Sequence, residues 1–310
     1  MPATRIITRP DFDGIVCAVL LKAIFGDATP IVWAQPNQIQ QGALKTESTD
    51  VVANLPLNGP CKLWFDHHIS NITRLPFKGL FRIAPSAARL VFEFFQDRLQ
   101  RGRFDELVHQ ADKIDAAQLS PEEIVHPEKY PFILLSMCIL TRNQRDLAFC
   151  DHLVDLLSSV RLETVMGDEW VRRRSTHVIA ANRLYETALK AHTLLRHSVS
   201  LTDFRGLDPT PEGNRFLVYS LFPASRVNVK IYDDPPQTVI KLGHSILNRT
   251  CYVNVGRLLA RYGGGGHWGA GACRLEAAQA DRCLGEIIEI LERNEPLEED
   301  RALARNGGEA

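Results

Sequence analysis

The sequence has no surplus of charge of either sign. Among its 310 residues, 36 lysines and arginines stand against 37 aspartates and glutamates, which gives a formal net charge of −1. Without an excess of cations the chain has few groups to neutralise many phosphates, which argues against long nucleic acid as an obligate partner. Apolar residues make up 45% and charged residues 24%, ordinary values that exclude a disordered, collagen-like or coiled-coil chain.

The sequence also lacks a cysteine framework and a long apolar run. Its seven cysteines are odd in number and include no Cys-x-x-Cys pair, so they fit a reducing compartment rather than a disulfide scaffold. The most apolar stretches, Ile15–Phe25 and Phe132–Leu140, are too short to span a bilayer. Acidic residues stand where the apolar core of a signal peptide would form. We therefore expect a cytoplasmic protein without a membrane partner.

Strand and helix patterns alternate in the N-terminal part. A helix-forming stretch, Ile15–Phe25, follows the first of four short runs that predict strands. Such alternation predicts an α/β fold, with βαβ units around a mostly parallel sheet and helices on both faces. Ligands of these sheets bind beyond the carboxyl ends of the strands. The predicted strands are Thr4–Thr8, Pro30–Ala34, Asp50–Asn54 and Cys61–Phe65.

The rest of the chain changes pattern once, near residue 195. Residues 85–192 have helical periodicity, and strands and helices then alternate again. We expect a domain over 1–192 that includes a helical linker, a smaller α/β domain over 195–294, and a frayed tail over 295–310. In the smaller domain the predicted strands are 199–204, 216–222, 225–232 and 272–276, and the predicted helices are 251–262 and 279–293.

Two carboxylates close the turn after the first predicted strand. Asp11 and Asp13 flank Phe12, with Pro10 and Gly14 on either side. Carboxylates two residues apart at the end of a strand can both point at a hard cation that takes oxygen ligands. The alternative is an acidic helix start, in which the carboxylates meet the positive end of the helix dipole.

A second titratable cluster, Asp66-His67-His68, ends the fourth predicted strand. In a regular strand the two histidines would face opposite sides, so both serve one site only if the chain bends, and Ser70 and Asn71 are compatible with a bend. The alternative is a hydrogen-bonded loop. A mixed carboxylate and imidazole site would prefer Mn²⁺, with Mg²⁺ as the second choice.

Asp112 and Asp115 lie three residues apart in a predicted helix and share a face with His109. They can reach the same site from a third element. The alternative is a solvated helix face on which the carboxylates pair with Lys113.

The most unusual stretch is a glycine-rich segment near the C-terminus. Its glycines allow close backbone approach and positive φ, so consecutive N–H groups can form a nest for an anion. Upstream, Asn248 supplies a polar side chain and Arg249 a plausible fork for phosphate. Trp268 can stack on a base or cover the loop, and a flexible linker is the alternative for the whole segment. The residues expected to bind substrate here are Gly264, Gly265, Gly266, His267, Gly269 and Gly271.

Together these motifs resemble the DHH phosphoesterase superfamily. The resemblance rests on Pro10–Gly14, Trp64–His68, Ala111-Asp112 and Tyr262–Gly271, which come in the family's order. It implies an N-terminal α/β catalytic domain, a helical linker and a C-terminal domain whose glycine-rich loop binds substrate. Within the superfamily, the chain is most similar to proteins described as exopolyphosphatase-related.

The resemblance also implies roles for single residues. Asp66 supports the histidines, and His68 faces the scissile phosphate. The implied reaction is a two-metal hydrolysis, in which two cations clamp the phosphate and a water between them attacks in line. The residues that match metal-binding positions are Asp11, Asp13, His67 and Asp112.

Two positions depart from the family pattern. Many relatives have a histidine shortly before the first aspartate pair, where this chain has Ile7, and a bridging aspartate at the end of the third strand, where it has Asn54. A neutral amide is a poor substitute for a bridging carboxylate. Arg9 can then occupy part of the vacated site and contact phosphate, so Arg9 and Asn54 join the expected substrate-binding residues.

We therefore expect a metal-dependent hydrolase of phosphoric esters or anhydrides that acts on a small phosphorylated substrate: polyphosphate, a nucleotide or a short oligonucleotide. The alternative is a catalytically degenerate module that binds phosphate or nucleotide without turnover. A processive exonuclease on long single strands is disfavoured, because grooves of that kind are basic. The sequence leaves a homodimer open.

Overall fold

The computed structural model describes residues 5–298, which fall into two compact units. The first unit takes in residues up to 119 together with 127–177, and the second takes in 120–126 and the residues from 178 onward. The division runs through helix α9 (Glu169–His192). The domain limits expected from the sequence stay a prediction, and the tail expected at 295–310 lies outside the described residues from 299 onward.

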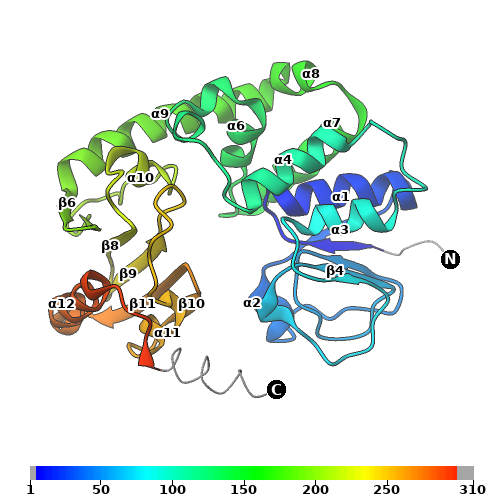
Figure 1. The fold of residues 1–310 in the computed structure, drawn as a ribbon. Helices are drawn as coiled ribbons and strands as arrows, with labels where there is room; N and C mark the ends of the chain where they lie inside the picture. Colours follow the sequence, from blue (N-terminus) through cyan, green and yellow to red (C-terminus); the bar gives the residue numbers. More distant parts are fainter. Residues whose placement is uncertain (1–4, 299–310) are drawn as a thin grey trace. The chain divides into compact units, whose positions relative to one another are not determined.

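The first unit is built on a five-stranded, all-parallel sheet with strand order β2-β1-β3-β4-β5 (Figure 1). The chain passes from β1 to β2 on one side of it and then to β3 on the other side. The strand order therefore reverses between β1 and β3. Ligands of open α/β sheets bind at such a reversal, beyond the carboxyl ends of the strands. The strands are β1 (Ile6–Thr8), β2 (Ile31–Trp33), β3 (Val51–Ala53), β4 (Leu63–Asp66) and β5 (Gly79–Phe81).

Helix α1 (Phe12–Phe25) is the central helix of this unit. Its residues 12–21 are all buried, because α3, α4 and α7 pack around it and β1 lies against it. An apolar sequence without a polar face predicts this kind of surrounded helix. The helix begins at Asp11, whose side chain accepts a hydrogen bond from the Gly14 N–H, and ends at Gly26, which has φ 108°.

The sheet buries side chains on both faces, as the sequence predicts. Ile7, Val52 and Trp64 are register partners on β1, β3 and β4, and they pack in one apolar cluster with Ile39 of α2 (Pro36–Gln40). Other helices and helical turns of the unit are α3 (Ala87–Phe94), α4 (Asp105–Asp115), α6 (Pro131–Cys138), α7 (Gln144–Ser159), α8 (Leu162–Gly167), and the 3₁₀ turns Ile69–Asn71 and Pro127–Lys129.

The second unit contains a six-stranded mixed sheet with strand order β10-β11-β9-β8-β7-β6. Only β7 and β8 run parallel in it. The strands are β6 (Thr193–Arg196), β7 (Val199–Asp203), β8 (Val227–Asp234), β9 (Gln237–His244), β10 (Gly265–His267) and β11 (Ala270–Glu276). The helices are α5 (Pro121–Val125), α10 (Leu217–Leu221), α11 (Val255–Ala260) and α12 (Ala277–Arg293).

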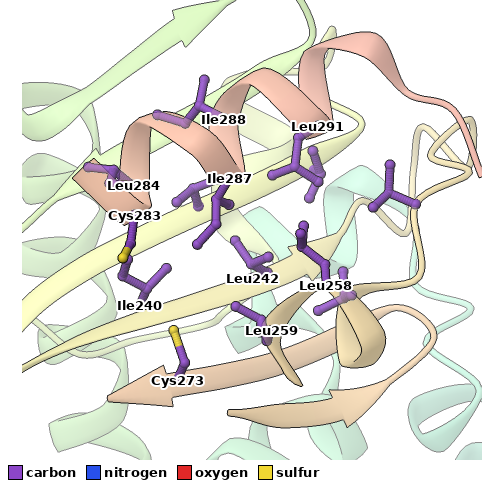
Figure 2. Packing of buried hydrophobic residues seen from close by; sticks show 14 of the residues in the cluster. Ile240, Leu242, Leu258, Leu259, Cys273, Cys283, Leu284, Ile287, Ile288 and Leu291 are labelled. Carbon is purple, nitrogen blue, oxygen red and sulfur yellow. The ribbon is translucent and has the colours of Figure 1, made fainter. Parts of the chain in front are cut away.

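One face of this sheet carries the apolar core of the second unit. Figure 2 shows Leu284 and Ile287 of α12 lying over the strand residues Ile240 and Leu242. Leu258 and Leu259 of α11 belong to the same cluster. The core is therefore closed by α12, which follows the last strand directly and packs on β7, β9 and β11, and by α11, which packs on β10 and β11.

One predicted strand is wrong, because residues 216–222 contain helix α10. The run Phe216–Phe222 is apolar almost throughout, and periodicity does not distinguish a short buried strand from a short buried helix. Asn214 decides the outcome locally. Its side-chain oxygen accepts from the Phe216 N–H and its carbonyl from the Leu217 N–H, which starts a helical turn.

Among residues 5–298, four strands lie outside the predicted set: β5, β6, β9 and β10. Strands β5 and β10 are three residues long, too short to display a period. In β9 the consecutive residues Thr238, Val239 and Ile240 are all buried, so the alternation that marks a half-exposed strand is absent.

Within residues 5–298, no helix has the length and apolar character that a membrane crossing requires.

Candidate active site

The first part of the site lies where the strand order reverses. Asp11 follows β1 and Asn54 follows β3, and Asn54 Nδ2 donates a 2.9 Å hydrogen bond to Asp11 Oδ1. The turn after β1 is tight: a Cβ placed on Gly14 would lie 1.8 Å from the Arg9 carbonyl oxygen. Only glycine fits at this position, so the turn that presents the carboxylates depends on it.

Asp13 is held by the start of another helix. Its Oδ2 accepts from the Ala87 N–H at 2.9 Å and its Oδ1 from the Ala88 N–H at 2.8 Å, both in the first turn of α3. These backbone donors and the helix dipole favour the carboxylate at this end of α3. Oδ1 also accepts from Cys17 Sγ at 3.9 Å, whereas Oδ2 keeps a further lone pair that can bind a cation.

His67 brings an imidazole to the same carboxylate. Its Nδ1 lies 3.0 Å from the Ala84 carbonyl oxygen, which can only accept, so Nδ1 carries the hydrogen and Nε2 of the neutral ring carries a lone pair. Nε2 lies 3.3 Å from Asp115 Oδ2 and 3.8 Å from Asp13 Oδ2. It is buried and has no hydrogen-bond partner among residues 5–298.

These three groups fit a divalent cation. Ligand atoms of Asp13, His67 and Asp115 all lie within 4.8 Å of one another. A buried Nε2 without a hydrogen-bond partner that faces two carboxylates favours a positive charge among the three groups. Two carboxylates with one imidazole are a donor set suited to Mn²⁺.

Burial and the negative charge of Asp115 both raise the pKa values of Asp11 and Asp13. Burial raises the pKa of Asp11 to about 6, where the charge of Arg9 lowers it and that of Asp115 raises it. Burial, together with the charges of Asp115 and Asp11, raises the pKa of Asp13 well above its ordinary value. A bound cation would relieve this repulsion, and it would have to displace protons to bind.

Asp66 organises the loop that follows β4. This fully buried carboxylate accepts at Oδ1 from the backbone N–H groups of His67 and His68, and at Oδ2 from Asn71 Nδ2 at 2.6 Å. His68 Nδ1 lies 2.8 Å from Asp66 Oδ1. The chain bends here into the 3₁₀ turn Ile69–Asn71, as the sequence suggests, so the two histidines do not follow strand alternation.

The Asp66 contact also sets the charge of His68. Burial by itself lowers the pKa of His68, but the hydrogen bond and the negative charge of Asp66 outweigh it, and the net pKa is raised. The ring is therefore disposed to carry a positive charge. The side chain of His68 is 28% exposed, which leaves it accessible to a ligand.

Asp112 has a different set of neighbours from the other expected ligands. Its Oδ1 accepts from Ser86 Oγ at 2.6 Å, and its Oδ2 accepts from Arg89 Nε at 2.8 Å and also pairs with Arg89 Nη2. Asp115, one helical turn further along α4, is the residue that approaches His67. The sequence places both aspartates on one helix face, but the arginine that engages one of them lies on α3 and is not visible in the spacing.

The glycine-rich segment of the second unit forms a hairpin rather than an open nest. Gly263 and Gly264 donate their N–H groups to the carbonyls of Ala260 and Leu259, so these two donors are used within the protein. The hairpin packs closely on α11, since a Cβ on Gly256 would lie 2.4 Å from the Gly266 carbonyl oxygen.

The other residues expected to bind substrate in the second unit differ in their exposure and contacts. His267 is exposed at the end of β10, and Trp268 next to it is 51% exposed and makes an edge contact with His244. Asn248 Nδ2 donates to the Ala224 carbonyl, and Arg249 Nε donates to the Ile246 carbonyl. These contacts fix the segment upstream of the hairpin. On the hairpin itself, the side chains of His267 and Trp268 are exposed.

The solved structures that share this fold support an assignment to the DHH phosphoesterase superfamily, in agreement with the resemblance carried by the motifs. Among them is PggH from Vibrio cholerae, described as a pGpG-specific phosphodiesterase. It is similar with a TM-score of 0.81 and 27% sequence identity, over 94% of this chain and 99% of that one. No family model and no curated protein matches the sequence.

Two more distant structures share the fold. An exopolyphosphatase-related protein from Bacteroides fragilis has a TM-score of 0.54 at 13% identity, over 93% of this chain and 92% of that one. RecJ from Thermus thermophilus, solved in complex with Mn²⁺, has a TM-score of 0.58 at 12% identity, and the match covers 93% of this chain and 52% of RecJ. At these identities the likeness establishes the fold alone.

Proposed function

We propose that the chain is a metal-dependent phosphodiesterase that hydrolyses short linear dinucleotides of the pGpG type. The metal dependence is carried by one observation: His67 Nε2, buried and without a hydrogen-bond partner among residues 5–298, faces Asp13 and Asp115. The substrate class is supported by the likeness to PggH and by the near-neutral net charge, which disfavours long polyanions.

Asp13, His67 and Asp115 would hold the cation. When bound, Mn²⁺ or Mg²⁺ supplies positive charge that polarises the phosphate and lowers the pKa of water. In this proposal Asp115 takes the place that the sequence suggests for Asp112, because Arg89 and Ser86 already engage the Asp112 carboxylate.

His68 would act on the substrate phosphate. Its raised pKa favours the cationic ring, and a cationic donor stabilises the negative charge that grows on phosphoryl oxygens during hydrolysis. Asp66 holds the His68 ring through Nδ1, which leaves Nε2 for the phosphate. In the second unit, His267 and Trp268 are the proposed contacts for phosphate and base, because they are the exposed side chains of the hairpin.

The test is a substrate panel with purified full-length protein. After chelation and dialysis, pGpG, cyclic di-GMP, pyrophosphate, polyphosphate and a single-stranded DNA are each incubated with and without Mn²⁺, and the products are separated by chromatography. We expect pGpG to be converted to GMP only when Mn²⁺ is present, with little turnover of the DNA. Asp115→Asn should abolish the reaction.

The same panel decides between this proposal and a module that binds without turnover. The pairing of Asp11 with Arg9 favours the binding module, because it uses a carboxylate that could otherwise bind metal. Binding of pGpG without hydrolysis in any metal would establish the module. Release of phosphate from polyphosphate in preference to pGpG would keep the enzyme and change its substrate.

A further inference from the structure

Three groups of the protein contact the Asp11 carboxylate. Its Oδ1 accepts from the Gly14 N–H and from Asn54 Nδ2, both at 2.9 Å, and its Oδ2 lies 3.1 Å from Arg9 Nε. Two hydrogen-bond donors and one guanidinium therefore surround it. Asp11 is also absent from the group of ligand atoms that converges on His67.

Asn54 is held in place for this contact. Its backbone has φ 56°, in the left-handed region that asparagine tolerates better than most residues, and its N–H donates to the Phe65 carbonyl. A carboxylate at this position would repel Asp11 and would need a cation between the two groups. The amide instead donates a hydrogen bond to Asp11 Oδ1.

Arg9 carries the positive charge of this part of the site. Its side chain is 40% exposed, and it approaches Asp11 through Nε, which lies 3.1 Å from Asp11 Oδ2. A guanidinium fixed through Nε presents its remaining donors in a planar fork that matches phosphate oxygens.

We propose that the site holds one divalent cation per chain, at Asp13, His67 and Asp115, and that Arg9, fixed by Asp11, supplies the second positive charge and binds the substrate phosphate. The inference rests on the proposed function and names the binding residue for the same substrate. Two-metal sites place their ions about 3.5–4 Å apart and clamp the phosphate from two sides. Here the guanidinium takes one side of that clamp.

The metal part is tested without turnover. Mn²⁺ is titrated into chelator-treated wild-type protein by calorimetry, and bound manganese is counted by elemental analysis after desalting. We expect one ion per chain and an electron paramagnetic resonance spectrum of isolated Mn²⁺. Two ions per chain with a spin-coupled spectrum would overturn the proposal, even if the protein hydrolyses pGpG.

The arginine part is tested by binding of GMP, a phosphate monoester that the protein would release. In the presence of Mn²⁺, Arg9→Met should weaken GMP binding by about tenfold to a hundredfold, the loss expected for a charge-assisted contact, while Mn²⁺ stoichiometry and affinity stay unchanged. Arg9→Lys should recover part of the affinity. The control is Arg161→Met, which removes an arginine that is 91% exposed and 3.9 Å from Glu163.

The outcomes separate the two proposals. If no substrate is turned over but one Mn²⁺ binds and Arg9→Met loses GMP, the proposed hydrolysis fails and the arginine role stands. If GMP affinity is the same in wild type and Arg9→Met, the arginine role is wrong whatever the activity. Tighter or additional Mn²⁺ binding in Arg9→Met would likewise contradict a site built for one ion.

Discussion

In the proposed function, Asp66 would act through its neighbour His68 rather than by contact with substrate. It is fully buried, and each of its carboxylate oxygens accepts hydrogen bonds from the loop that follows β4. Its hydrogen bond and charge raise the pKa of His68 against the effect of burial. A buried carboxylate that orients an imidazole and stabilises its cation is a recurring arrangement in hydrolases.

Replacing Asp66 by asparagine should therefore change the pH dependence of hydrolysis. A raised pKa keeps His68 cationic to higher pH, and activity that needs the cation is lost as pH rises through that pKa. In Asp66→Asn the pKa of His68 falls, so the alkaline limb of the kcat profile should move to lower pH. The profile is measured from acidic to alkaline pH under saturating Mn²⁺.

A matched control for this experiment is Asp146→Asn. Asp146 is a buried carboxylate of α7 that pairs with Arg174 at 2.7 Å, away from the histidines. The Asp146→Asn substitution should lower stability without moving the alkaline limb of the kcat profile. An unchanged limb in Asp66→Asn would show that His68 does not act as a cation.

Single residues differ in how far the sequence predicts them. Asp13 and His67 follow apolar strands, and the rule that parallel sheets bind ligands at the carboxyl ends of strands brings them together. The rule does not choose between Asp112 and Asp115, which share a helix face. That choice depends on Arg89, whose contact with Asp112 joins two helices and has no local signature.

At the scale of elements, helices α3 and α4 are joined by a polar contact beside the site. Ser86 caps α3 by accepting from the Arg89 N–H at 3.0 Å, and its hydroxyl donates to Asp112 Oδ1. Arg89 reaches the same carboxylate, which is only 13% exposed. The contact fixes the start of α3, whose first N–H groups hold Asp13.

Asparagine substitutions should separate the two aspartates of α4. Asp115→Asn should weaken Mn²⁺ binding by about a hundredfold or more, because it removes a ligand. Asp112→Asn should keep the Mn²⁺ affinity within a few-fold and lower the free energy of unfolding by about 1–2 kcal/mol, because a partly buried ion pair is lost. Calorimetry with Mn²⁺ and urea denaturation measure the two effects. The opposite pattern would return the metal role to Asp112.

The elements themselves were predictable where they are long or bounded by strong signals. Helix α1 is marked by Asp11 at its start and Gly26 at its end, and α12 by its apolar stripe. Helix α10 is five residues of an apolar run, and its helical form depends on Asn214, which also donates to the Ile124 carbonyl of α5. A contact so distant in sequence cannot be read from the run itself.

At the scale of the whole molecule, the near-neutral net charge hides a strongly acidic site. Burial raises the pKa of Asp11 and of Asp13, and the charge of Asp115 adds to the rise in both. Without a cation these groups favour protonation, so the folded state binds protons that the unfolded chain releases. Such a group stabilises the fold below its unfolded pKa, and that contribution is lost as pH rises through the folded pKa.

Metal-dependent stability should therefore vary with pH. For Asp11 the stabilisation is fully present below about pH 4, the ordinary range for aspartate, and is lost as pH rises through about 6. The increase in Tm caused by Mn²⁺ should thus be small near pH 5 and larger near pH 7.5, measured by differential scanning fluorimetry at constant ionic strength.

Two variants test which residues cause the pH and Mn²⁺ dependence of Tm. Asp11→Asn should flatten the pH dependence of Tm in the metal-free protein, because it removes the group with the pKa of about 6 and keeps an acceptor for the Gly14 N–H. Asp115→Asn should abolish the Mn²⁺ effect at every pH. A Tm increase in Asp115→Asn equal to that of wild type would place the cation elsewhere.

The central claim is that Asp13, His67 and Asp115 bind one catalytic cation, and anomalous X-ray scattering from crystals grown with Mn²⁺ tests it most directly. We predict a single anomalous peak per chain, about 2.0–2.4 Å from Asp13 Oδ2, His67 Nε2 and Asp115 Oδ2. A peak bound by Asp112 instead, or no peak beside His67 in protein that hydrolyses pGpG, would contradict the account.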